Sequence, residues 1–199
     1  MASHSILFYA VITLIAVYCL YVYYEMDTFN LKCVISDVDG NRYCVRDRKD
    51  LSETADLLAH VTNKCKTLVE YVDKKYKGEN EEINRLVENF NPKSISETLP
   101  TSELTAYSEN KGEKIAFCLT KTKKTKKLID LNTLTFVAIH ELSHLMTKSI
   151  GHKLEFWENF KFLLENAKEA NVYDPVNYKQ NPAEFCGMKI TDNPYFDLE

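Results

Sequence analysis

Residues 134–146 read LTFVAIHELSHLM, and this stretch decides how the rest of the chain is interpreted. Apolar residues fill most of its positions, which predicts a helix from about 131 to 148 that is buried on most sides, with Gly151 placed to end it. Positions four apart lie on one face of a helix, so His140 and His144 point the same way. Because polar groups in a core need partners, we interpret the stretch as a buried helix that carries a site.

The residues His140, Glu141 and His144 form the pattern HExxH. Two imidazoles one helical turn apart can bind the same tetrahedral zinc ion, and zinc lowers the pKa of its bound water toward neutrality. The carboxylate of Glu141 can take a proton from that water as it attacks a carbonyl, and can then protonate the leaving amine. The pattern therefore predicts a zinc site on His140 and His144, with Glu141 as the catalytic general base.

A catalytic zinc site needs a third protein ligand. The chain has 5 His; His4 precedes the first apolar run, and His60 lies on the polar side of a predicted helix. His152 follows Gly151, where a short loop can bring it to the metal. We expect His152 to be the third ligand. The alternative is Glu184 in the segment NPAEF, which would give a site of two His and one Glu.

The segment 5–24, SILFYAVITLIAVYCLYVYY, contains 20 residues and no charge. As a helix it would be about 30 Å long, which matches a bilayer core, and its tyrosines gather at one end as in an aromatic belt. A cleaved signal peptide fits less well, because no Lys or Arg precedes the run and no small-residue cleavage site follows it. We expect residues 1–27 to be a transmembrane anchor and residues 28–199 to be the folded domain.

The charges around this anchor say little about its orientation. No Lys or Arg precedes the run, whereas Lys32 and Arg42 follow it among acidic residues. Under the positive-inside rule this count slightly favours a cytoplasmic C-terminal domain. We therefore expect a single-pass membrane protein with that orientation weakly favoured.

The overall composition excludes several classes of protein. With 199 residues, 45% hydrophobic and 27% charged, the chain is one domain with an appendage and is not disordered. Five lysines lie between Lys121 and Lys127, and we read them as a solvated loop. The net charge of −4 argues against a nucleic-acid partner.

Periodicity predicts the remaining elements. Apolar residues recurring at three and four positions predict amphipathic helices over 51–76, 80–90 and 154–169. The inner face of the third helix is expected to contain Phe156, Trp157, Phe160, Leu163 and Leu164. Alternation predicts β-hairpins over 32–47 and 104–120, whereas 91–103 and 173–199 are expected to be irregular because they are polar or rich in proline.

The loop length of the first hairpin decides whether it carries a disulfide. A four-residue loop, 37–40, would set Cys33 opposite Cys44, whereas a two-residue loop would set Ile35 there instead. A disulfide between Cys33 and Cys44 is feasible in the first register and strained in the second. Both registers stay open from the sequence.

HELSH, then seven residues, then His152, followed by Phe156 and Trp157, resembles the zincin-type metallopeptidases of the SprT-like, WLM and YgjP group. The resemblance covers residues 130–165, with a loop two residues longer than usual, and departs from the metzincin pattern at Thr147 and Ile150. It implies an α+β zincin-like domain with an HExxH active-site helix and a small antiparallel sheet, and hence zinc-dependent hydrolysis of peptide bonds.

The resemblance also implies details around the site. The strand 113–119, EKIAFCL, would be the sheet edge that pairs with an extended substrate. Tyr173 and Tyr178 are candidates for stabilising an oxyanion. With its anchor, the whole chain resembles small metallopeptidases predicted in large DNA viruses, which implies a virion or host-cell membrane.

The sequence leaves two classes of function open. The first is a membrane-anchored zinc metallopeptidase that acts on a protein or peptide. The second is a membrane-tethered structural protein, such as a minor virion component in contact with capsid proteins, whose protease-derived domain is inactive. The anchor on a compact domain motivates this second, structural hypothesis.

Overall fold

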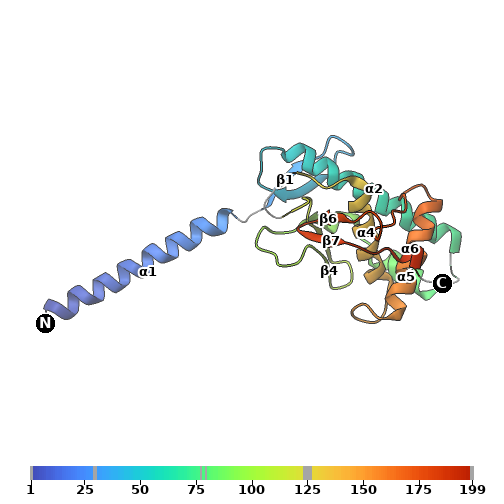
Figure 1. Cartoon of the computed structure of the whole chain (residues 1–199). Coiled ribbons are helices and arrows are strands. Elements are labelled where there is room, and N and C mark those ends of the chain that lie inside the picture. The colour runs from blue at the N-terminus through green and yellow to red at the C-terminus, as the bar shows by residue number, and fades with distance from the viewer. Residues whose placement is uncertain (1, 29–30, 77, 79, 123–126, 198–199) are drawn as a thin grey trace.

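The computed structural model describes residues 2–28, 31–76, 78, 80–122 and 127–197 (Figure 1). It has the expected mixed α+β composition, with small sheets and one apolar N-terminal helix. The predicted lysine-rich loop lies largely outside the described residues. The helices are α1 (Ala2–Thr28), α2 (Leu51–Tyr76), α3 (Glu81–Asn89), α4 (Leu131–Met146), α5 (Leu154–Glu169) and α6 (Pro194–Asp197).

Helix α1 stands apart from the rest of the chain in Figure 1. Its stretch Ile6–Tyr23 is 18 residues long with a mean hydropathy of 2.2, and none of it is buried. By length and composition this helix is apolar enough to cross a membrane, as the sequence predicted.

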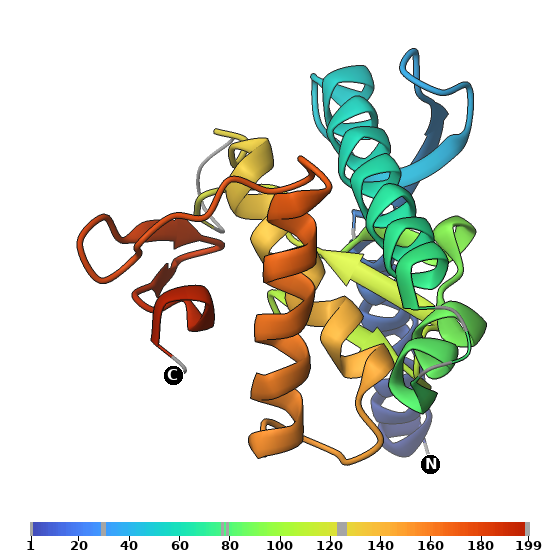
Figure 2. The same ribbon diagram turned by 90° about the vertical axis from the view of Figure 1, so that its right-hand side faces the viewer.

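Helix α4 lies at the centre of the folded part and contacts α2, α3, α5 and the strand β4 (Ala106–Glu109). Figure 2 shows α2, α4 and α5 side by side. The Asp130 side chain caps α4 by accepting a hydrogen bond from the Thr133 backbone N–H at 2.8 Å. The helix ends at Met146, two residues before the expected end near residue 148, because Thr147 is already extended and its hydroxyl donates to the Ser143 carbonyl at 2.7 Å.

The first hairpin pairs β1 (Leu31–Ile35) with β2 (Arg42–Arg46) in antiparallel register. Cys33 lies opposite Cys44, and the two form a disulfide. The register with the four-residue loop is therefore the one that the structure adopts.

The second hairpin is also present, and it belongs to a sheet of three strands in the order β3-β5-β4. Strand β4 pairs antiparallel with β5 (Lys114–Phe117), as predicted for 104–120. Strand β3 (Ile95–Glu97) pairs parallel with β5 and follows a 3₁₀ turn, Pro92–Ser94. The expectation that 91–103 is all loop was wrong there, because parallel pairing with a distant strand leaves no local alternation in three residues.

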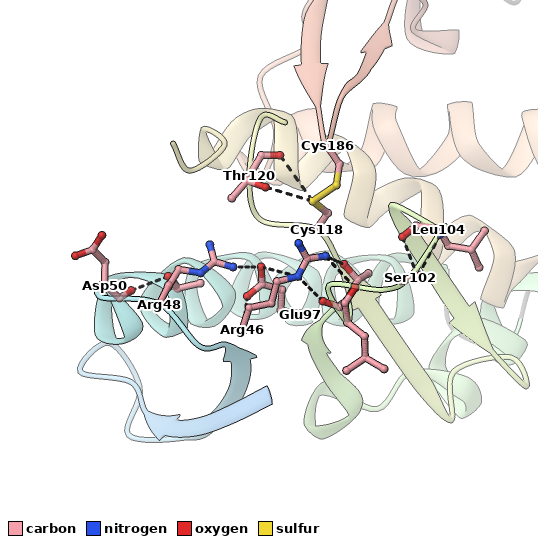
Figure 3. A network of polar contacts seen from close by, with 12 residues as sticks. Arg46, Arg48, Asp50, Glu97, Ser102, Leu104, Cys118, Thr120 and Cys186 are labelled. Carbon is pink, nitrogen blue, oxygen red and sulfur yellow. Dashed lines mark hydrogen bonds and ion pairs between the residues drawn. A yellow bond between two sulfur atoms is a disulfide. The ribbon is translucent and has the colours of Figure 1, made fainter. Parts of the chain in front are cut away.

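An ion-pair network joins the first hairpin to this sheet (Figure 3). The side chain of Glu97 is fully buried and contacts the guanidinium groups of Arg46 and Arg48. It also accepts a hydrogen bond from the Arg46 backbone N–H at 2.8 Å. Burial raises the pKa of Glu97, and the two arginines oppose that rise.

The C-terminal segment, expected to be irregular, contains a third hairpin of β6 (Ala183–Phe185) and β7 (Met188–Ile190). A disulfide between Cys186, at its turn, and Cys118, just after β5, ties it to the central sheet (Figure 3). The backbone N–H of Cys186 also donates to the Thr120 carbonyl at 2.9 Å. The expectation was wrong because strands of three residues are too short to show a period.

Candidate metal centre

The three predicted histidines meet at one point. The ligand nitrogens of His140, His144 and His152 all lie within 4.8 Å of one another. The Nε2 of His152 lies 3.1 Å from that of His140 and 3.2 Å from that of His144. Helix α4 supplies two of the rings, and the connection to α5 supplies the third.

These distances suit a tetrahedral metal. Nitrogens about 2.0–2.1 Å from a zinc ion at tetrahedral corners lie about 3.3 Å from one another. Hydrogen bonds alone account for the arrangement less well, because the Nε2 of His152 carries at most one proton and can donate to only one of its two neighbours. A cation placed among the three nitrogens would satisfy them all.

The imidazoles of His140 and His144 are held in the neutral state that a metal requires. Burial, together with the neighbouring His144 and His152, lowers the pKa of His140 to about 3. Burial likewise lowers the pKa of His144 to about 4, with His152 and Lys111 adding to the effect. Neutral rings offer free lone pairs, so metal binding need not displace protons from these two groups near neutral pH.

A single aromatic ring packs against all three imidazoles. The ring centroid of Phe156, on α5, lies 4.8 Å from His140, 4.4 Å from His144 and 4.6 Å from His152. Phe156 is fully buried, and Phe160 adds a contact with His140 at 5.2 Å. Because close packing restricts rotamers, these contacts fix the directions in which the three rings point.

Glu141 follows the first histidine and is 5% exposed. Burial raises the pKa of Glu141 to about 7, and a hydrogen bond from Ser108, on β4, opposes the rise. A carboxyl group with a pKa near neutrality can both accept and return a proton at that pH. This is the property that the predicted role of Glu141 as a general base requires.

The loop that carries His152 is fastened at its start. The Glu155 carboxylate accepts hydrogen bonds from the backbone N–H groups of Lys148 at 2.8 Å and Ser149 at 3.2 Å. The ammonium group of Lys111 contacts the backbone carbonyl of Thr147. It also donates a hydrogen bond to the backbone carbonyl of Lys148 at 3.2 Å. These contacts fix the path of the chain between α4 and α5.

The loop is also fastened at its end. The indole N–H of Trp157 donates to the His152 carbonyl at 3.1 Å. Trp157 was expected on the inner face of α5, but it is 37% exposed and lies beside the loop instead. The reason is its place at the edge of the apolar stripe, next to Phe156, where the stripe meets the loop.

A cleft of about 460 Å³ opens in front of the histidines. The three histidines, Glu141 and residues of β4, including Ala106 and Ser108, line it. The strand expected at the substrate edge, EKIAFCL, contains β5, which is central in the sheet and so has no free edge. Among the described residues, β4 is the edge strand beside the cleft.

The other candidates lie elsewhere. Glu184 is on β6 and lines a different hollow with Lys121 and Lys189. Tyr173 and Tyr178 are buried against Phe136 in the core, so neither can reach a substrate in the cleft.

The remaining histidine of the folded domain, His60, is exposed on α2, as expected. The sequence marked Phe156 only as part of an apolar helix face and of the resemblance, and it offered no signal for Glu155. Both lie one helical turn or less beyond His152, but only the folded loop brings them to the site.

Comparison with known proteins points to large DNA viruses. An uncharacterised protein of Acanthamoeba polyphaga mimivirus is 28% identical over 166 residues, which cover 80% of this chain and 82% of that protein. An uncharacterised protein of Invertebrate iridescent virus 3 is 39% identical over 70 residues, 35% of this chain and 43% of that protein. One from Invertebrate iridescent virus 6 is 36% identical over 65 residues, 32% of this chain and 36% of that protein.

The viral part of the expected resemblance therefore fits these relatives. The chain spans less than half the length of the two iridescent virus proteins. No family model matches the chain. No solved structure matches it either.

Proposed function

We propose that this protein is a membrane-anchored zinc-dependent peptidase of viral type. The observation that carries the proposal is the convergence of three Nε2 atoms, with 3.1 and 3.2 Å between them, beside a buried carboxylate. A zinc ion bound by His140, His144 and His152 would acidify water and polarise a carbonyl oxygen. The resemblance of the HExxH segment to zincin peptidases points to the peptide bond as the bond that is cut.

Each residue of the site has a defined part in this reaction. Glu141 accepts a proton from the attacking water and returns it to the leaving amine, which its pKa of about 7 permits in both directions. A hydrogen bond from Ser108 favours the charged form of the Glu141 carboxylate, the form that accepts the proton. Phe156 packs against the three rings and keeps them aimed at one point.

The free edge of β4 favours a substrate in extended conformation. An edge strand exposes backbone N–H and C=O groups that can pair with a peptide laid alongside it. Because β4 lines the cleft through Ala106, Tyr107 and Ser108, a peptide paired with it would pass in front of Glu141. An exposed, unfolded segment of a protein is the substrate that meets this requirement.

The full chain in detergent micelles tests the proposal. We expect elemental analysis to find about one zinc per chain, and an unfolded test protein to be cut in a reaction that a chelator stops. Glu141→Gln should keep the zinc and lower the turnover by about 10²–10⁴-fold, because it removes the proton acceptor.

Glu184→Gln is the matched control, because Glu184 is a carboxylate on β6 outside the cleft. It should leave both zinc content and turnover unchanged. Turnover that survives Glu141→Gln, or a chain that binds no zinc, would contradict the proposal. Zinc without turnover of any protein would favour the structural alternative.

The proposal includes a location. Helix α1 anchors the domain in a viral or host-cell membrane, and two disulfides lie in the folded domain. Disulfides persist on the oxidising side of membranes, so we propose a domain outside the cytoplasm, opposite to the orientation that the Lys/Arg count slightly favours. In sealed microsomes the domain should resist added protease; digestion to the level of α1 would reverse the assignment.

A further inference from the structure

A second hollow adjoins the candidate metal centre. It has a volume of about 190 Å³ and shares Ala106, His140 and Glu141 with the cleft. Its other walls are almost entirely apolar and come from α4 and the C-terminal hairpin: Phe136, Val137, Phe185, Met188 and Ile190. We call it the apolar pocket.

We propose that the apolar pocket receives an apolar side chain of the peptide substrate, directly beside the bond that is cut. This inference rests on the proposed function and names the substrate that the site prefers. Apart from His140, Glu141 and Thr105, every residue that lines the pocket is apolar. A cavity of about 150 Å³ with apolar walls binds benzene, so this pocket of about 190 Å³ has room for a leucine, methionine or phenylalanine side chain.

The position of the pocket along β4 explains how a side chain would reach it. Thr105 and Ala106, where β4 begins, line the pocket, and Ser108 lies farther along the strand in the cleft. Side chains of an extended peptide point alternately to opposite faces. A peptide paired with β4 would therefore turn every second side chain toward α4, and the one beside Glu141 would meet the apolar pocket.

The outer wall of the pocket has a fixed position. The disulfide between Cys118 and Cys186 ties the turn of the hairpin to the end of β5. The backbone N–H of Gly187 adds a hydrogen bond to the Lys121 carbonyl at 2.8 Å. The pocket is thus bounded by the buried helix α4 on one side and by a cross-linked hairpin on the other.

Met188 offers a way to alter the pocket without disturbing the core. Its side chain is 50% exposed at the rim, whereas Phe185 is 1% exposed. Met188→Lys places a charge at the pocket entrance and leaves every ligand of the metal intact. Val38→Lys is the control, because Val38 is 39% exposed in the β1–β2 loop, away from the cleft.

Two measurements on the full chain in micelles test the inference. The first sequences the cut sites in a pool of random peptides. The second measures binding of fluorescent peptides by the zinc-loaded Glu141→Gln variant, using pairs that differ only by leucine or alanine at one position. We expect cut sites rich in leucine, methionine or phenylalanine on one side of the bond, and at least tenfold tighter binding of the leucine peptide. Met188→Lys should abolish both preferences, and Val38→Lys should keep them.

The outcomes separate the two proposals. Hydrolysis with no apolar preference, or a preference that survives Met188→Lys, overturns the pocket and leaves the peptidase. A leucine preference in binding that Met188→Lys abolishes, found when the zinc-loaded wild-type chain shows no turnover, supports an apolar side-chain pocket and overturns the peptidase. Equal binding of the leucine and alanine peptides overturns the pocket whatever the activity.

Discussion

The two sides of the apolar pocket are built in different ways. On one side, His140 and His144 project from a helix that packs against α2, α3 and α5, and Phe156 packs against their rings. On the other side, the hairpin β6–β7 has strands of three residues each and is joined to the sheet through Cys186. The geometry of the candidate metal centre thus depends on packing, whereas the shape of the pocket wall depends on a cross-link.

Removing the cross-link should have the largest effect on stability. The disulfide between Cys118 and Cys186 spans 68 positions and that between Cys33 and Cys44 spans 11. Chain entropy predicts a loss of about 4 kcal/mol in the free energy of unfolding for the double serine variant of the first pair and about 3 kcal/mol for the second. Urea unfolding of the full chain in micelles measures both.

The same variants sharpen the comparison between the two sides. Zinc affinity should stay within a few-fold of wild type when Cys118 and Cys186 are replaced, because none of the three proposed ligands lies on the hairpin. A large loss of zinc affinity in that variant would mean that the hairpin, and not the core, holds the histidines in place.

Removing the proposed third ligand, His152, should have the next largest effect, in this case on zinc affinity. Replacing a residue that only hydrogen-bonds a metal ligand already lowers metal affinity by about 10–100-fold. Loss of a ligand itself should cost more, so His152→Ala should weaken zinc binding by at least about 100-fold. His60→Ala is the control, since His60 is exposed on α2. Competition with a chromogenic chelator measures both, and equal affinities would remove His152 from the ligand set.

Loosening the loop should have the smallest effect of the three. Glu155→Gln weakens the two hydrogen bonds that hold the backbone of Lys148 and Ser149. We expect zinc affinity to fall by about tenfold, because His152 must then be ordered by the metal itself. Glu158→Gln, an exposed position on the same helix, should change nothing; an equal loss in both variants would point to helix stability instead.

The long helices could be predicted because their signal is repeated. Helices α2 and α5 begin and end at the residues that periodicity gave, since each carries several turns of apolar spacing. The strands β3, β6 and β7 have three residues each, so alternation has no room to develop. Their pairing depends on partners far along the chain, which no local pattern contains.

Within the candidate site, too, local spacing predicts some features whereas contacts between distant segments decide others. His140, Glu141 and His144 follow from the spacing along one helix, and the meeting of His152 with them agrees with the loop argument. The packing of Phe156 against the rings and the outward position of Trp157 depend on how α5 crosses α4. Hydrophobic spacing assigns both aromatics to one face, and only the tertiary fold separates them.

The short connection after α1 limits where this protein can act. Leu31, which begins β1, follows Tyr23, which ends the apolar stretch, by eight positions. Eight residues reach at most about 29 Å when fully extended. With α1 in a bilayer, as we propose, a domain held so closely would meet its partners mainly in two dimensions, where the lateral density of neighbouring proteins, rather than their bulk concentration, sets how often they collide.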